Sequence, residues 1–203
     1  LEIYRESMQY RAEVERHIDA LNRTLNELKH RIYPPGLIDL DIAYTAYKAG
    51  NLELRKYLEF LLGEAEKRAI HVKHYTNLYL LAQVMQMEEE IDFRQADIER
   101  NVLIDELKKG LSRYELTELL SNVMDYKTKK ISRKVFFTYL LNKAKSLNVD
   151  TDKFPALSNY VVYVTTFEAV DRAAVNTESE ALEAEIKETM YTSDKERTLS
   201  RLS

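Results

Sequence analysis

The clearest pattern of apolar and polar positions lies near the N-terminus of the chain. Apolar residues there alternate at spacings of four and three: Val14, Ile18, Leu21, Leu25, Leu28 and Ile32. This is the spacing of a coiled-coil seam, in which one helix packs lengthwise against another. Ser7 and Arg11 occupy the same seam upstream, so the apolar contact weakens there. The pattern predicts a helix over 2–32 whose seam contacts a partner, chiefly through Val14, Ile18, Leu21 and Leu25.

Turn-forming residues fall where the other helices are expected to begin and end. Pro34 cannot continue a helix, and Gly50 separates two further helical stretches. Gly110 suits the left-handed position after a helix, and Ser112 with Glu115 has the capping-box pattern of a helix start. The predicted helices are 2–32, 37–48, 52–69, 77–109, 113–125, 131–147, 156–190 and a last one from 194 onward.

An internal repeat runs through most of the chain. A shift of 79 residues places segment 37–109 on segment 116–188 without a gap. Identical pairs include Leu40/Leu119, Tyr47/Tyr126, Leu61/Leu140, Ala65/Ala144, Leu78/Leu157, Glu99/Glu178 and Leu103/Leu182. Apolar pairs such as Tyr57/Phe136 and Tyr75/Phe154 follow the same pattern. Self-similarity at one fixed period predicts a duplicated structural unit.

Each repeat is expected to hold a short helix, a medium helix and a long helix. Because two helices separate successive long ones, the long helices should alternate in direction. The predicted fold is all-α, an elongated bundle of three long antiparallel helices joined by two short helical hairpins. Its parts are an N-terminal long helix in 1–36, repeat units in 37–110 and 116–190, and the start of a further helix in 193–203.

The composition agrees with an all-α fold and narrows the possible partners. Only 4 Gly and 3 Pro occur among 203 residues, too few for the many tight turns of sandwiches or barrels. The net charge of −4 disfavours a dedicated nucleic-acid binder, which usually carries a basic excess. The absence of cysteine excludes disulfides and thiolate metal sites.

The least polar stretch, Leu78–Met87, has about half of the length that a bilayer crossing requires. We therefore expect no membrane span in this segment. The chain starts at Leu1 without a signal-peptide pattern, and both of its ends have the pattern of a helix interior. We expect a piece of a longer protein located in the cytoplasm, with an extracytoplasmic location as an open alternative.

Acidic residues spaced by seven form a stripe in each repeat. Asp92, Glu99 and Glu106 lie in the first repeat, and Asp171, Glu178 and Glu185 lie in the second. A stripe of this kind could hold a cation between equivalent helices. The favoured interpretation is a flanking position of a coiled coil that pairs with Lys or Arg, because exposed pairs of that kind are common.

Two histidine motifs and one basic run are further candidates for chemistry. Glu27 and His30 have a spacing found in carboxylate-bridged metal sites, but no second copy of the motif occurs. His71 and His74 lie in a predicted loop without an obvious third ligand. Segment 127–134 holds five basic residues and could bind phosphate, although a solvated turn between helices is favoured. We expect no cofactor and no metal.

The favoured function is a non-enzymatic helical interaction or assembly module, a scaffold that contacts helices of its own kind or of another protein. The chain carries no recognisable catalytic motif, and its 14 tyrosines suit interfaces that are apolar in the middle and wet at the edge. The alternative is a ligand-sensing region of a receptor or signalling protein, with a pocket between the repeats lined by Tyr47, Tyr75, Tyr126 and Phe154. A metal-dependent enzyme, built on Glu27, His30, His71 and His74, is the second and less favoured alternative.

Overall fold

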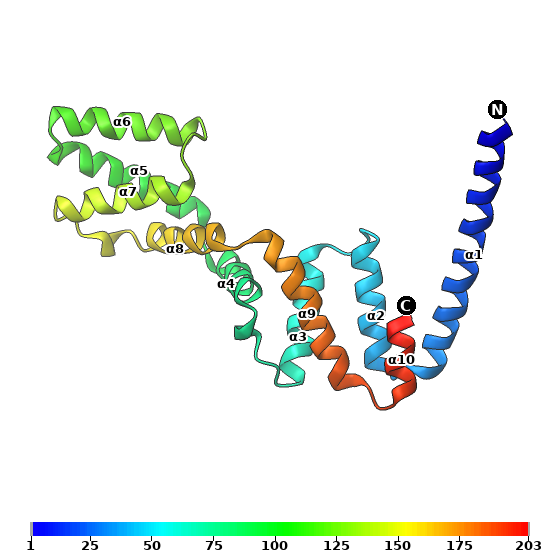
Figure 1. Cartoon of the computed structure of the whole chain (residues 1–203). Coiled ribbons are helices and arrows are strands. Elements are labelled where there is room, and N and C mark those ends of the chain that lie inside the picture. Colours follow the sequence, from blue (N-terminus) through cyan, green and yellow to red (C-terminus); the bar gives the residue numbers. More distant parts are fainter. Residues whose placement is uncertain (1, 203) are drawn as a thin grey trace. The chain divides into compact units, whose positions relative to one another are not determined.

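A computed structural model describes the backbone of residues 2–202 and the side chains of residues 10, 11 and 13–202. The described backbone is all-helical, which confirms the predicted fold class (Figure 1). Its α-helices are α1 (Glu2–Ile32), α2 (Pro35–Lys48), α3 (Leu54–Lys67), α4 (Thr76–Glu90), α5 (Phe93–Gly110), α6 (Arg113–Lys127), α7 (Arg133–Ser146), α8 (Pro155–Ala169), α9 (Arg172–Met190) and α10 (Asp194–Leu202). Two short 3₁₀ turns, η1 (Val72–His74) and η2 (Thr151–Lys153), precede α4 and α8.

The prediction of continuous helices over 77–109 and 156–190 is wrong. The first is broken between α4 and α5, where Ile91 turns to an extended ψ of 125° and the Asp92 side chain accepts a hydrogen bond from the Gln95 N–H. The second is broken between α8 and α9, where Val170 has a ψ of 120° and Asp171 accepts from the Ala173 N–H. A side-chain cap at an aspartate therefore starts a new helix at each break. Of the three predicted long helices, only α1 has the predicted length.

The chain folds into two compact units. Unit 1 comprises the residues up to Val72 together with those from Ser179 onward, and unit 2 comprises Lys73–Glu178. Unit 1 therefore holds α1, α2, α3, most of α9 and α10, whereas unit 2 holds α4 to α8 and the first turns of α9. Each of the predicted repeat units contributes helices to both compact units.

Unit 2 is built around α8, which packs against α4, α5 and α7, while α6 pairs with α7 as a hairpin (Figure 1). Its apolar positions recur at helical spacing on each helix, so that one face of every helix is turned inward. The main core consists of Leu103, Leu107, Leu111, Leu119, Phe136, Phe137, Leu140, Ala144, Phe154, Leu157 and Val161. The stacked rings of Tyr126 and Phe136, with centroids 4.3 Å apart, join α6 to α7.

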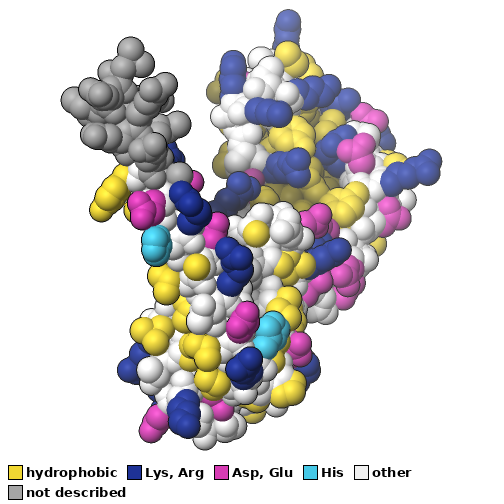
Figure 2. Space-filling view, turned by 90° about the vertical axis from the view of Figure 1, so that its right-hand side faces the viewer, with side chains coloured by type: hydrophobic (Ala, Val, Ile, Leu, Met, Phe, Trp, Pro, Cys, Tyr) yellow, Lys and Arg dark blue, Asp and Glu magenta, His cyan; other side chains and the backbone are white. Residues whose placement is uncertain are grey.

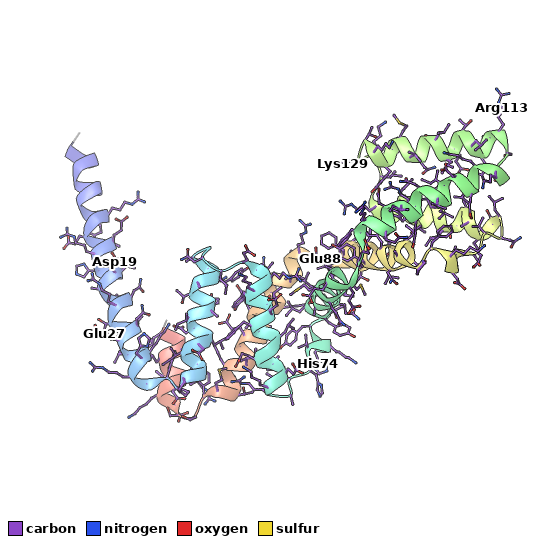
Figure 3. The ribbon with its side chains drawn as sticks, turned by 180° about the vertical axis from the view of Figure 1, so that it is seen from behind. Asp19, Glu27, His74, Glu88, Arg113 and Lys129 are labelled. Carbon is purple, nitrogen blue, oxygen red and sulfur yellow. The ribbon has the colours of Figure 1, made fainter. Side chains whose placement is uncertain are left out.

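Unit 1 is built on the hairpin of α2 and α3, with α10 packed against α1. Its buried side chains include Tyr33, Leu37, Leu40, Tyr57, Leu58, Leu61, Ala65, Leu182, Ile186 and Leu199. In Figures 1 and 3 the N-terminal half of α1 extends away from α2 and α10. None of the described helices combines the length and the apolar composition that crossing a membrane requires.

The turns inside the two hairpins use left-handed backbone at equivalent places. Gly50, with a φ of 74°, follows α2, and Lys129, with a φ of 58°, follows α6. Further left-handed residues, Ala69 with a φ of 54° and Asn148 with a φ of 53°, follow α3 and α7. Residues with a Cβ adopt this conformation at a cost, whereas glycine does not.

Candidate functional site

An apolar stripe on α1 is exposed over most of its length. The exposed fraction is 43% for Val14, 50% for Ile18 and 63% for Leu21, whereas Leu25 is half-buried. A shallow groove of about 300 Å³ runs along the stripe and is also lined by Tyr10. The part of the predicted seam at Ser7 lies outside the residues whose side chains the structure describes. The four residues predicted to contact a partner therefore share one helix, and three of them are exposed.

Unit 1 contains a network of charged and hydroxyl side chains next to this helix. The Tyr57 hydroxyl donates to the Glu183 carboxylate at 2.6 Å, and the Lys187 ammonium pairs with the same carboxylate. The ammonium group of Lys187 also lies 5.3 Å from the centre of the Tyr44 ring. Glu183 is 4% exposed, so its negative charge is stabilised by these two partners instead of by water. The network therefore joins α2, α3 and α9 within unit 1.

A polar groove of about 460 Å³ opens above this network. Its lining residues are Lys29, Asp41, Tyr44, Thr45, Glu180, Glu183, Ala184, Lys187 and Ser200. The Lys29 ammonium and the Asp41 carboxylate pair at 2.7 Å across it. Burial lowers the pKa of Lys187, but the hydrogen bond and charge of Glu183 outweigh burial and leave this pKa raised. The charged residues that line this groove are matched in pairs, which is typical of a structural network.

Stability in acid should depend on Glu64, a buried carboxylate of α3 that pairs with Lys67 and Arg68 at 2.6 Å each. Burial alone would raise the pKa of Glu64, but these two cations outweigh it and lower the pKa below its ordinary value of 4.5. The group therefore stabilises the fold above that ordinary pKa, and the contribution is lost as pH falls through the lowered value. We expect Glu64→Gln to cost about 1–2 kcal/mol at pH 7 and progressively less as the pH falls below 4.5.

Urea unfolding at pH 7, 5, 4 and 3 measures this dependence. The matched control is Glu66→Gln, which changes an exposed carboxylate two positions along the same helix. Equal losses of stability for Glu64→Gln at pH 7 and at pH 3 would contradict the assignment.

Two members of the acidic stripe, Glu99 and Glu178, cap the N-termini of other helices. Glu99, 7% exposed, accepts a hydrogen bond from the Leu157 N–H at 2.8 Å, at the start of α8. Glu178 accepts from the Asn77 and Leu78 N–H groups at 2.8 and 2.9 Å, at the start of α4. A carboxylate suits the positive end of a helix and the donors that the first turn leaves unpaired. These two glutamates are thus used to hold α4 and α8 in place.

A larger groove, of about 670 Å³, lies within unit 2. We refer to it as the aromatic groove, and its lining residues are Phe93, Arg94, Ala96, Asp97, Ile98, Arg100, Tyr126, Phe137 and Tyr160. The Phe137 and Tyr160 rings meet edge to face with centroids 5.0 Å apart, and Phe93 meets Tyr160 in the same way at 6.1 Å. In Figure 2, Lys and Arg side chains gather around exposed hydrophobic side chains on unit 2, at the upper right.

The predicted pocket residues fall into different surroundings. Tyr47, in unit 1, stacks on Tyr57 with centroids 4.5 Å apart. Tyr75, Tyr126 and Phe154 belong to unit 2, where Phe154 is 4% exposed in the core and Tyr75 is half-buried before α4. Of the four, Tyr126 alone lines one of the grooves described above, at the edge of the aromatic groove.

The predicted metal motifs do not assemble into a ligand set. Glu27 and His30 are exposed on α1. His71, just before η1, and His74, its last residue, are exposed as well. Figure 3 labels Glu27 and His74. The described residues contain no group of three or more His, Asp and Glu side chains placed to hold one metal ion. In the basic segment, the Lys130 ammonium is 3.6 Å from the Asp125 carboxylate, and Lys127, Lys129 and Lys134 are exposed.

Glu183, Arg94 and Arg100 were not singled out by the sequence patterns. Glu183 had a usable signal, because it interrupts an apolar helix face at the position where the predicted first repeat has Ile104. The two arginines had none, since charged residues near a helix start are ordinary on a solvated surface. Only their place beside the aromatic rings distinguishes them.

Comparison with known proteins gave no relative: no family model, no curated protein and no solved structure matches this chain.

Proposed function

We propose that this chain is a helical interaction module that associates with a second copy of itself through the apolar stripe of α1. The single observation that carries the proposal is the exposure of Val14, Ile18 and Leu21 on a helix whose N-terminal half stands apart from the rest of unit 1. A coiled-coil seam buries such residues only when a second helix lies along it. An identical helix supplies the same spacing and therefore a matching seam.

The rest of unit 1 explains why the stripe stays exposed within one copy. The last helix, α10, packs against α1, and the neighbouring Tyr33 is 7% exposed. Upstream of Leu25 the seam residues have large exposed fractions, which rise to 63% at Leu21. Isolated exposed apolar residues are ordinary, but a continuous stripe at heptad spacing is typical of an interface.

We also propose that the scaffold arose by duplication with a period of 79 residues. Helices α3 and α7, α4 and α8, and the turns η1 and η2 have bounds that differ by that number at both ends. The left-handed residues Gly50 and Lys129 differ by it as well, as do Ala69 and Asn148. Two stacked ring pairs, Tyr47 on Tyr57 and Tyr126 on Phe136, obey the same shift.

Substitution of the stripe tests the proposed association. Ile18→Glu with Leu21→Glu places charges on the seam of both copies and keeps good helix formers in α1. Each apolar side chain contributes about 1.5–3 kcal/mol on burial, so losing two from each copy should abolish association at micromolar concentrations. Sedimentation velocity over a hundredfold range of concentration measures the effect.

The matched control carries two changes on other faces of α1, Asp19→Ala and Arg23→Ala, and should associate as the unmodified chain does. Figure 3 shows Asp19 on α1, well away from α10. A chain that stays monomeric up to 100 µM without any substitution would overturn the proposal, as would an assembly that the double glutamate variant leaves intact.

A second candidate function, a ligand-sensing helical region, is favoured by the aromatic groove of unit 2. Its volume of about 670 Å³ lies in the range of small-molecule sites, and aromatic rings form much of its lining. A ligand that binds folded unit 2 raises the melting temperature of the chain. Screening a compound library by thermal shift should yield compounds whose effect disappears in Tyr160→Leu. A library without any such compound would contradict this function.

A further inference from the structure

The aromatic groove combines rings with an excess of positive charge. Arg94 and Arg100 line it, and Asp97 is the only acidic side chain among the described residues of its lining. The Arg100 guanidinium pairs with Asp97 at 2.6 Å and also bonds to Asn101. Arg94 is exposed, and no ion pair in the described part of the chain involves its guanidinium. One cation at the groove is therefore neutralised locally and one is not.

A third guanidinium lies beside the rings. Burial raises the pKa of the Tyr160 hydroxyl, and the positive charge of the neighbouring Arg133 partly opposes that shift. Arg133 begins α7 and belongs to the basic segment 127–134, in which Lys127 and Lys129 are exposed. Figure 3 shows Lys129 at the end of α6 that is opposite to Arg113. The basic segment therefore adjoins the aromatic groove, which Tyr126 of α6 also lines.

The helix packing that the two repeats have in common does not require the three arginines or Tyr160. At a shift of 79, Arg94, Arg100 and Arg133 correspond to Ala173, Ser179 and Leu54, and Tyr160 corresponds to Leu81. Helices α3 and α7, and α4 and α8, nevertheless have bounds that differ by 79 at both ends, and α5 and α9 begin at positions that differ by 79. Small or aliphatic residues therefore suffice at these positions for helix formation. The cations and the extra ring are specific to the aromatic groove.

We propose that the aromatic groove binds an organic anion, a carboxylate or a phosphate carried on a flat apolar ring system. The planar guanidinium of Arg94 is suited to bidentate contact with either anion. Phe93 and Tyr160 offer ring edges and faces against which a flat group can pack. This inference rests on the ligand-sensing function proposed above and names its ligand class.

Four probe compounds separate the contributions of the anionic group and of the ring system: 2-naphthyl phosphate, 2-naphthoate, 2-naphthol and inorganic phosphate. Binding to the full chain is followed by amide chemical shifts in nuclear magnetic resonance. A ligand of this size at ordinary efficiency binds with a dissociation constant of about 0.1–1 mM. We expect 2-naphthyl phosphate or 2-naphthoate to shift the amides of residues 93–100 and 126, and to bind at least tenfold more tightly than 2-naphthol or inorganic phosphate. The tighter of the two anions identifies the anionic group.

Two variants and one control test the residues. Arg94→Ala should weaken binding of the preferred anion at least tenfold, and Tyr160→Leu, which installs the residue of the other repeat, should weaken it at least fivefold. Arg113→Ala removes a cation at the opposite end of α6 and should have no effect.

Three kinds of result would overturn the inference in distinguishable ways. If 2-naphthol shifts the same amides with equal affinity, or if Arg94→Ala and Arg113→Ala behave alike, the groove binds ligands but not organic anions. If none of the four compounds shifts these amides and the thermal-shift screen is also empty, the ligand-sensing function fails together with the ligand class. If inorganic phosphate binds as tightly as the ring-bearing anions, the aromatic rings do not contribute to ligand recognition.

Discussion

Replacing Glu183 by leucine is expected to destabilise unit 1 by about 3–5 kcal/mol. The carboxylate is 4% exposed and serves two partners, the Tyr57 hydroxyl at 2.6 Å and the Lys187 ammonium. Leucine fills the space but leaves a half-buried ammonium and a buried hydroxyl without their acceptor. Removal of one member of a buried pair costs more than the pair itself contributes, because the remaining charge is poorly solvated.

Native-state hydrogen exchange measures this effect, since it reports the two compact units separately. Amides of α3 and α9 should lose protection in Glu183→Leu, while those of α7 and α8 should not. The matched control is Glu180→Leu, three residues earlier on α9, where the side chain is 61% exposed and pairs with Lys48. It should cost less than about 1 kcal/mol. Equal effects of the two substitutions would show that the buried network does not stabilise unit 1.

Replacing Phe136 by alanine is expected to destabilise unit 2 by about 3–5 kcal/mol. The ring is 1% exposed, stacks on Tyr126 at 4.3 Å and meets Phe137 edge to face at 5.3 Å. Truncation removes its burial and leaves a cavity between α6 and α7 that the surrounding rings cannot fill completely. The stacked Tyr126 also lines the aromatic groove, so this substitution should disturb the groove as well.

Urea unfolding followed by circular dichroism measures the loss, and hydrogen exchange assigns it to α6 and α7. Val135→Ala is the control, because it truncates the preceding residue of the same helix at a side chain that is 53% exposed. That variant should stay within about 0.5 kcal/mol of the unmodified chain. If Phe136→Ala cost no more than Val135→Ala, the core assignment would be wrong.

Much of the fold could be predicted because helix ends carry local chemical signals. Ser112 and Glu115 form the predicted capping box, and the helix after Pro34 begins where proline permits. The breaks before α5 and α9 were missed because no Gly or Pro marks them. There a β-branched residue followed by aspartate interrupts an apolar pattern that otherwise continues, and the interruption depends on a cap formed by a single side chain.

The division into compact units could not be predicted, since it depends on contacts between distant segments. Tyr57 and Glu183 are more than a hundred residues apart, and no periodicity relates them. The candidate sites likewise differ in how far they depend on contacts between distant segments. The stripe of α1 was predictable because it lies on one helix, whereas the aromatic groove combines residues of α5, α6, α7 and α8. The roles of Glu99 and Glu178 as caps likewise depend on where α8 and α4 begin.

The hairpin turn between α6 and α7 combines a strained backbone conformation with a positively charged side chain. Lys129 has a φ of 58° where the other hairpin has Gly50. Glycine at this position would relieve about 1 kcal/mol of backbone strain. It would also delete one of the five basic residues in segment 127–134, next to the groove that Tyr126 lines. The turn thus retains a cation at the expense of backbone strain, a cost that the glycine of the other hairpin avoids.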